Sequence, residues 1–168
     1  MAHGPHEDMK KNDSINGGTL AMALKLREIP VIGIVGRIVM HCLSVTIPKD
    51  VKIGKGVILN HNCYGTVMHP LTTIGDYASI YQNVTLGRKY PFGHYGGIVI
   101  GEHATVCAGA KVLAGTEPLI IGKGAVVAAN AVLTHSIGDF EVWAGVPARK
   151  IATLSPDDPR WFEENIGG

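Results

Sequence analysis

The sequence predicts a parallel β-helix, an all-β solenoid, and three features of the chain support this fold class. Aliphatic residues recur at every sixth position, in phased runs from Ile47 to about Leu133. A glycine directly follows several of these anchors, as at Gly54 and Gly75. The phase holds over several anchors at a time, whereas an ordinary β-sandwich gives turn signals at irregular spacings of roughly 8–12 residues. Internal repeats of this kind decide the architecture of a chain.

Each hexad predicts one short strand and one tight corner. Three hexads make one triangular turn, in which the anchor points inward and a glycine or another small residue lets the backbone turn. A single turn cannot bury its own apolar interior, so the turns must stack on one another. The expected inward anchors are Ile47, Ile53, Leu59, Met68, Ile74, Ile80, Leu86, Ile100, Val106, Val112, Ile121, Val127 and Leu133.

Three insertions interrupt the six-residue period. The extra residues lie around positions 61–65, 88–97 and 115–118. Insertions in solenoids form loops on one face or edge, which is often the binding face. The first two insertions each carry a histidine, His61 and His94. We therefore expect the functional site near these two loops.

Composition and charge exclude several classes of function. The chain has 168 residues, which suits one domain, and a formal net charge of +1 with scattered basic residues. A nucleic-acid partner is therefore not expected. The three cysteines, Cys42, Cys63 and Cys107, share no metal-type spacing and suit a reducing cytoplasm. We expect no metal, and neither a phosphate-binding loop nor a dinucleotide fingerprint occurs.

Four segments are expected. Residues 1–18 are polar, lack the apolar core of a signal peptide, and are expected to be mobile. Residues 19–45 are apolar but broken by Pro30 and two glycines, so they predict a helical cap on the coil and not a membrane span. Peripheral membrane contact is the less favoured alternative. Residues 46–154 form the β-helix. Residues 155–168 predict a C-terminal helix, because Ser155-Pro156-Asp157-Asp158 looks like a helix start.

Four stretches carry a resemblance to a known family. They read IPKDVKIGKGVILNHNCYG, TIGDYASIYQNVTLG, IGEHATVCAGAKVLAG and VWAGVPARKI. From about Thr46 to Leu154, the chain resembles the hexapeptide-repeat acyltransferases, and within them the serine acetyltransferase-like branch. The resemblance implies a left-handed β-helix that assembles as a homotrimer. It also implies that acetyl-CoA binds in the groove between neighbouring subunits and gives its acetyl group to a hydroxyl.

The resemblance also assigns roles to residues. The catalytic histidine of the family follows a hexad that ends in leucine, which here places it on His61 in LNHNCYG. The second histidine of the family has His94 as its nearest match. The residues expected to line the acetyl-CoA groove or meet the CoA phosphates are Gly87, Ala108, Gly109, Ala129, Arg149 and Lys150.

The chain departs from the serine acetyltransferase pattern at three places. Thr46 and Asn60 stand where the family has aspartates, and the C-terminus reads ENIGG where the family has an isoleucine tail that docks with cysteine synthase. We therefore expect no stable docking with cysteine synthase. The acceptor is L-serine or a sugar hydroxyl, as in the short enzymes of polysaccharide assembly. N-acylation of an amino sugar and a non-catalytic scaffold or small-ligand binder remain alternatives.

The residue types fit acyl transfer to a hydroxyl. A hydroxyl attacks a thioester poorly while it keeps its proton, and a neutral imidazole can remove that proton. Histidine suits this role because its pKa of roughly 6.5 lies near working pH. We predict that His61 is the general base, and that corner N–H groups or His94 stabilise the oxyanion.

Further residues near these histidines are expected to contact the acceptor. These are Asn60, Asn62, Tyr64 and His69, and His69 is also a reserve candidate for the base. Cys63 offers a rival mechanism, in which a thiol activated by His61 is the nucleophile. Small-residue packing at a coil corner explains a cysteine equally well.

Overall fold

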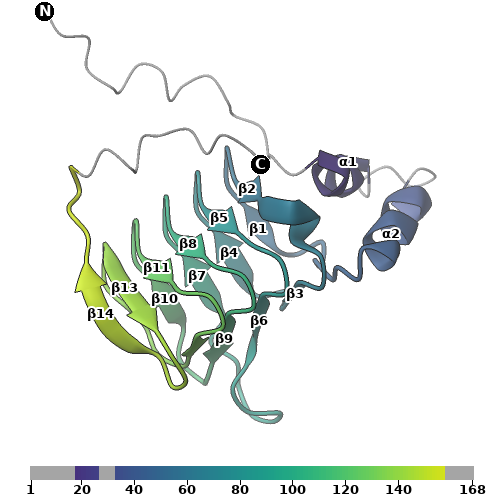
Figure 1. Ribbon diagram of the computed structural model, residues 1–168. Coiled ribbons are helices and arrows are strands. Elements are labelled where there is room, and N and C mark those ends of the chain that lie inside the picture. Colours follow the sequence, from purple (N-terminus) through teal and green to yellow (C-terminus); the bar gives the residue numbers. More distant parts are fainter. Residues whose placement is uncertain (1–17, 27–32, 158–168) are drawn as a thin grey trace, which may run out of the picture.

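The computed structural model describes residues 18–26 and 33–157. Two helices, α1 (Gly18–Leu26) and α2 (Gly33–Cys42), lie at one end of a stack of short strands (Figure 1). Leu20 and Leu24 of α1 and Met40 of α2 are buried in the same apolar cluster as the first strands. The helices thus close that end of the strand core. The expected mobile segment lies outside the described residues, except for Gly18.

The strands are short and follow one another closely. In chain order they are β1 (Lys52–Ile53), β2 (Ile58–Leu59), β3 (Val67–Met68), β4 (Thr72–Ile74), β5 (Ser79–Ile80), β6 (Thr85–Arg88), β7 (Ile98–Ile100), β8 (Thr105–Val106), β9 (Lys111–Ala114), β10 (Leu119–Ile121), β11 (Val126–Val127), β12 (Val132–Leu133), β13 (Glu141–Ala144) and β14 (Arg149–Thr153). Most of the expected C-terminal helix of residues 155–168 lies outside the described residues; its described start is not helical, and residues 156–157 form a turn.

Successive strands fall on three sheets in rotation. The first sheet has the order β1-β4-β7-β10, the second β14-β13-β11-β8-β5-β2, and the third β12-β9-β6-β3. The pairs within β1 to β12 are parallel, and the second sheet ends in the antiparallel pair β13–β14. The predicted parallel strands are confirmed. From β1 to β12 every third strand lies on the same sheet, as the six-residue period requires.

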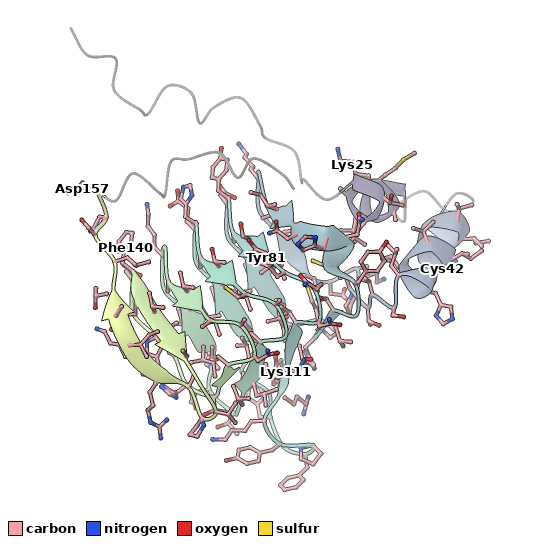
Figure 2. The ribbon with its side chains drawn as sticks, in the orientation of Figure 1. Lys25, Cys42, Tyr81, Lys111, Phe140 and Asp157 are labelled. Carbon is pink, nitrogen blue, oxygen red and sulfur yellow. The ribbon has the colours of Figure 1, made fainter. Side chains whose placement is uncertain are left out.

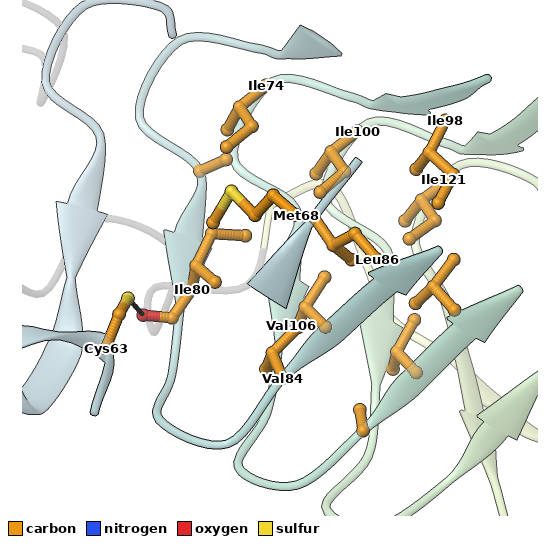
Figure 3. Close-up of a cluster of buried hydrophobic side chains, with 14 of the residues drawn as sticks. Cys63, Met68, Ile74, Ile80, Val84, Leu86, Ile98, Ile100, Val106 and Ile121 are labelled. Carbon is orange, nitrogen blue, oxygen red and sulfur yellow. Dashed lines mark hydrogen bonds between the residues drawn. The ribbon is translucent and has the colours of Figure 1, made fainter. Parts of the chain in front are cut away.

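Each hexad buries two side chains. The predicted anchors are all buried except Ile53, which is partly buried (Figure 3). A second buried residue lies two positions before an anchor, because alternate residues of a strand face the same side. Examples of this second position are Val57, Ala78, Ala104 and Ala125. The repeat therefore specifies both inward positions, of which sequence analysis identified one.

The corners use left-handed backbone at defined positions. Tyr77 and His103 adopt φ of 57° and 56° at equivalent corners, and their rings stack with centroids 5.2 Å apart. Gly109 has φ of 72°, and a Cβ at this position would collide with the side chain of Asn130. A non-glycine residue there would be strained by the backbone and would have to displace the Asn130 side chain of the neighbouring turn.

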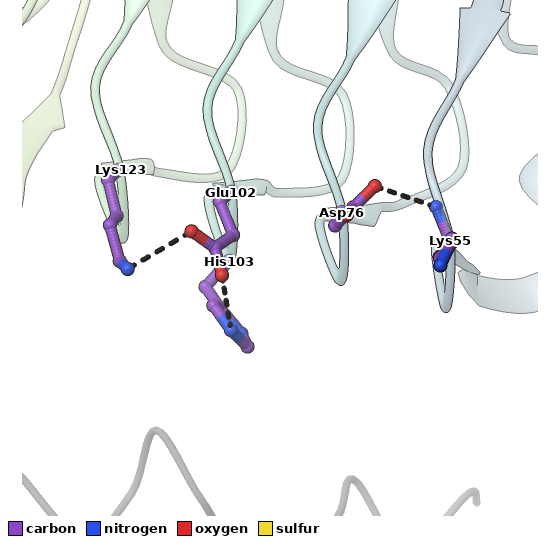
Figure 4. Close-up of polar contacts among 5 residues, drawn as sticks. All are labelled: Lys55, Asp76, Glu102, His103 and Lys123. Carbon is purple, nitrogen blue, oxygen red and sulfur yellow. Dashed lines mark hydrogen bonds and ion pairs between the residues drawn. The ribbon is translucent and has the colours of Figure 1, made fainter. Parts of the chain in front are cut away.

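Polar contacts tie successive corners between the first and second sheets (Figure 4). The Lys55 N–H donates to Asp76 Oδ1 at 2.8 Å. Glu102 pairs with Lys123 at 3.0 Å and with His103 at 3.5 Å. Exposed ion pairs contribute little to stability. The Asp76 carboxylate, which accepts a backbone N–H from the preceding turn, is therefore the more important contact, because it satisfies a corner donor.

Candidate active site

His61 lies on a sharp turn between β2 and β3. Residues Asn60–Cys63 form a short 3-10 turn in which His61, Asn62 and Cys63 have φ of 50°, 50° and 47°. This run of left-handed backbone accommodates the residues inserted into the hexad. The His61 side chain is exposed, and its ring centroid lies 6.2 Å from that of Tyr81.

The corners that follow His61 stack on one edge of the molecule. This edge joins the second and third sheets and comprises residues 60–66, 81–84, 107–110 and 128–131; we call it the His61 edge. Backbone hydrogen bonds join its levels: Asn83 N–H to Tyr64 O at 2.7 Å, Gly109 N–H to Gln82 O at 3.0 Å, and Asn130 N–H to Ala108 O at 2.9 Å. The structure thus brings His61 onto the same edge as Ala108, Gly109 and Ala129, with Gly87 in the adjoining strand β6.

The His61 edge carries amides and no carboxylates. None of its residues, all of which the structure describes, is an aspartate or glutamate. Two buried polar atoms on it have no hydrogen-bond partner within the described residues, the donor Asn60 Nδ2 and the acceptor Gln82 Oε1. Buried polar groups are normally paired, and an unpaired one costs about 1–3 kcal/mol. These two atoms therefore favour a polar ligand or water at this edge.

Two other expected acceptor residues are placed differently. Asn62 Oδ1 accepts the Leu20 N–H at 3.3 Å, which ties the turn to the first residues of α1. Its carbonyl oxygen therefore has a structural contact. Tyr64 is about half exposed and lies on the same turn as His61.

His94 lies on a different edge. The loop that carries it, residues 89–97, leads from β6 in the third sheet to β7 in the first sheet. His61 instead precedes the third sheet, so the two histidines lie at opposite ends of the strands of that sheet. The side chain of His94 is exposed. One chain by itself does not bring His61 and His94 together.

The loop of His94 is held by a cluster of three side chains. Arg88 Nη1 donates to Gly93 O at 3.1 Å, and the Arg88 guanidinium lies 5.1 Å from the ring centroid of Tyr95. The ring of His69 packs against Tyr95 with centroids 4.0 Å apart. Tyr95 is 3% exposed. These contacts fix the base of the loop against the corner after β3.

His69 is poorly placed to act as the base. Its Nδ1 accepts the Leu71 N–H at 3.2 Å, and its Nε2 lies 3.5 Å from the Arg88 Nε donor. A neutral imidazole has one accepting nitrogen, and either contact occupies it. Burial, followed by the charge of Arg88, lowers the pKa of His69, so the ring stays neutral. His69 therefore packs the loop, whereas the imidazole of His61 is exposed.

Cys63 does not supply a nucleophile. Its side chain is fully buried, and Sγ donates to Ile80 O at 3.4 Å (Figure 3). Burial raises the pKa of the Cys63 thiol to about 12, against a smaller lowering by a hydrogen bond with Thr66. The thiolate is the reactive form of cysteine. The thiol mechanism therefore lacks its reactive species at neutral pH.

Known proteins similar to this chain are serine acetyltransferases. No family model matches the chain. It is 35% identical over 121 residues to the Escherichia coli serine acetyltransferase, which covers 70% of this chain and 43% of that protein. It is 34% identical over 119 residues to a putative serine acetyltransferase of Schizosaccharomyces pombe, covering 71% and 41%. The chain belongs to the serine acetyltransferase-like family.

Solved structures agree with this assignment. The Neisseria gonorrhoeae serine acetyltransferase in complex with serine matches with a TM-score of 0.63 and 25% identity, over 80% of this chain and 52% of that one. The Brucella abortus enzyme in complex with coenzyme A shares the fold, with a TM-score of 0.65 and 23% identity, over 82% and 54%. The chain spans about two fifths of the length of the two curated relatives.

Arg149 and Lys150, expected at the CoA phosphates, both lie on β14 but make different contacts. Lys150 Nζ donates to Glu141 Oε1 at 2.7 Å, within the β13–β14 hairpin. The Arg149 guanidinium is exposed and donates to Ala148 O at 2.9 Å. Hydrogen bonds from Lys150, Trp143 Nε1 and the Gly138 N–H lower the pKa of Glu141 to about 2. Lys150 is thus engaged in the fold of this serine acetyltransferase-like chain.

The sequence alone did not point to Tyr81, Gln82 or Arg88 as site residues. Tyr81 and Gln82 lie one turn of the coil from His61, so aligning the hexads three at a time would have shown them. Arg88 ends strand β6, and the six-residue period gives no signal that it meets Tyr95 of the inserted loop. In residues 18–26 and 33–157, no three histidine, cysteine or acidic side chains gather as metal ligands. Neither described helix has the length and apolar content needed to cross a membrane.

Proposed function

We propose that this chain is an acetyl-CoA-dependent O-acetyltransferase with His61 as its general base. The observation that carries the proposal is the exposed imidazole of His61 on one edge with Ala108 and Gly109, in a member of the serine acetyltransferase-like family. Because both curated relatives are named serine acetyltransferases, L-serine is the first acceptor, and O-acetylserine the product.

The reaction needs one proton transfer in each direction. The neutral imidazole of His61 removes the proton of the acceptor hydroxyl while its oxygen attacks the thioester carbonyl. The new C–O bond forms, the C–S bond breaks, and the imidazolium returns the proton to the leaving thiolate of CoA. Corner N–H groups or His94 stabilise the oxyanion. Holding both substrates in one cleft contributes at least as much as the proton transfer, so no covalent acyl-enzyme is needed.

The active assembly in this proposal is a homotrimer of left-handed β-helices. The support for it is that His61 and His94 lie at opposite ends of the strands of the third sheet. A cyclic assembly can set the His61 edge of one subunit against the loop of the next. Acetyl-CoA would then lie between subunits, along Gly87, Ala108, Gly109 and Ala129, with its phosphates near Arg149 and Lys150. The coenzyme A complex of the related Brucella abortus enzyme supports this choice of co-substrate.

A sugar hydroxyl is the second candidate acceptor. The observation that favours it is the amide-rich His61 edge, which has no carboxylate to pair with the ammonium group of an amino acid. Asn60 Nδ2 and Gln82 Oε1, a donor and an acceptor without partners, suit the hydroxyls of a neutral sugar. The free thiols of the three cysteines suit the expected cytoplasmic location.

The test is release of CoA thiol from acetyl-CoA, measured with L-serine and with a panel of sugars. The proposal expects thiol release above the rate of solvent hydrolysis with at least one of them. The acceptor with the highest kcat/KM is then the substrate. No release with any acceptor, combined with retained ligand binding, would favour the scaffold alternative. The mass in solution tests the trimer, and a monomer would contradict it.

A further inference from the structure

The helical pair exposes an apolar surface that the proposed reaction does not use. Three aliphatic side chains of α2, Ile34, Val35 and Ile38, are 53%, 53% and 56% exposed, and Met22 of α1 is 64% exposed. We call the three side chains of α2 the helical patch. The opposite side of α2, with Gly36 and Met40, is buried.

The patch is organised by helical geometry. Residues Ile34 and Ile38 are one turn apart, so they lie on the same face of α2, with Val35 beside them. Arg37, which is also exposed, follows on the adjoining face. An aliphatic stripe bordered by cationic side chains is typical of helices that lie in the surface of a membrane.

The charge of both helices has one sign. Neither α1 (GTLAMALKL) nor α2 (GIVGRIVMHC) contains an aspartate or glutamate, and their charged groups are Lys25 and Arg37. Figure 2 shows Lys25 on α1, at the opposite end of the molecule from Phe140. A second copy of this patch would set cations against cations. An anionic surface would instead complement them, and each Lys or Arg near such a surface strengthens its binding.

We propose that the helical patch docks on the surface of an anionic lipid membrane, without spanning it. The side chains of the patch are aliphatic and include none of the aromatic residues that anchor protein–protein contacts. A lipid surface requires only apolar area and positive charge. For residues 19–45 the sequence favoured a cap without membrane contact, whereas the exposed face of α2 favours contact. That expectation came from breaks in the apolar run, which argue against a span but leave one apolar face intact.

Symmetry would strengthen the docking. In a cyclic assembly, equivalent surfaces of all subunits lie at the same height along the axis. Three patches could then meet one membrane together, which raises the effective affinity without new contacts. Membrane docking does not depend on acetyl transfer, so a negative result for either proposal leaves the other unaffected.

The experiment is co-sedimentation of the full chain with vesicles. The vesicles are phosphatidylcholine alone, or phosphatidylcholine with added phosphatidylglycerol, at low and high salt. The parent should pellet with the anionic vesicles at low salt and remain in solution with the neutral ones. The double variant Ile34→Ser/Ile38→Ser should lose at least about tenfold in partitioning. Arg37→Gln, which keeps the apolar face, should lose about fivefold at low salt.

A matched control is Ile151→Ser, which removes an equally exposed isoleucine from β14 at the other end of the coil. It should pellet like the parent. The proposal is overturned if the parent does not pellet with anionic vesicles, or if the double variant pellets as the parent does. It is also overturned if the double variant forms a smaller assembly in solution than the parent and binds vesicles equally well. The patch would then be an interface between copies.

Discussion

The imidazole ring of His69 lies against the phenol ring of Tyr95, with the ring centroids 4.0 Å apart and the planes tilted by 49°. His69 belongs to the corner after β3, and Tyr95 to the loop before β7, so this contact sets the base of the loop that carries His94. Arg88 completes the cluster through its contacts with both rings. The orientation of this loop is therefore decided by packing against a corner of the preceding turn of the coil.

The Tyr95 ring should matter more than its hydroxyl. The hydroxyl is buried and has no hydrogen-bond partner within the described residues. Tyr95→Phe removes an unpaired polar group and should raise the free energy of unfolding by about 1 kcal/mol. Tyr95→Ala leaves a cavity and should lower it by about 3 kcal/mol. Urea denaturation monitored by circular dichroism measures both. A Tyr95→Phe variant as unstable as Tyr95→Ala would show that the hydroxyl has a partner.

His61→Asn should abolish most of the proposed activity without unfolding the corner. Asparagine tolerates the left-handed backbone that His61 adopts at φ of 50°. Losing the base should lower kcat at least about a hundredfold, with binding of CoA unchanged by calorimetry. His103→Asn is the matched control, because His103 has φ of 56° on another edge. His103→Asn should keep the parental rate. Equal rates for His61→Asn and the parent would remove His61 from the mechanism.

The cysteines should differ sharply in reactivity. Cys42 is exposed, whereas burial raises the pKa of Cys107 and, to about 12, that of Cys63. Because thiolate is the species that reacts, a disulfide reagent at pH 8 should label Cys42 first, Cys107 more slowly, and Cys63 only on unfolding. Cys63→Ala should keep kcat within about threefold. A hundredfold loss with native circular dichroism would revive the thiol mechanism.

Glu141 should make the β13–β14 hairpin sensitive to acid. Hydrogen bonds from Lys150, Trp143 and Gly138 lower the pKa of Glu141 from 4.5 to about 2 in the folded chain. Its stabilisation is therefore complete above about pH 4.5 and is lost as the pH falls toward 2. Glu141→Gln should lower Tm at pH 7 and approach the parent below pH 3. The exposed Glu117→Gln serves as the control, and its Tm should follow the parent at both pH values. A Tm difference for Glu141→Gln that stays constant with pH would argue against ionisation.

Arg149 should contribute mainly to acetyl-CoA binding, and Lys150 mainly to the stability of the β13–β14 hairpin. Lys150 already pairs with Glu141 at 2.7 Å, whereas the exposed Arg149 guanidinium, within the described part of the chain, donates to the Ala148 carbonyl. Arg149→Gln should raise KM for acetyl-CoA about tenfold with little change in Tm. Lys150→Gln should instead lower Tm with a smaller change in KM. Steady-state kinetics and thermal melts on the same preparations check both. The reverse pattern would exchange the two roles.

Much of the fold could be predicted from the hexads. Residues such as Ile74 and Leu86 recur at a spacing that only a stacked coil buries efficiently, so the period carries long-range information. The second inward position, for example Ala104, follows from strand alternation once the anchor is known. The candidate site was harder to predict. His61 could be found because it lies in an insertion, but its neighbour Tyr81 required the register of the stack.

The sequence by itself determined the parallel strands, the inward anchors and the histidine-bearing insertions. These three features depend only on spacing along the chain, and the six-residue period shows that spacing directly. Only the tertiary structure decided that His61 and His94 lie on different edges, that Lys150 pairs with Glu141, and that Cys63 is buried. These depend on which turns lie above one another and on what fills the space between them. Distances between side chains of separate turns are set by packing, and packing leaves no period in the sequence.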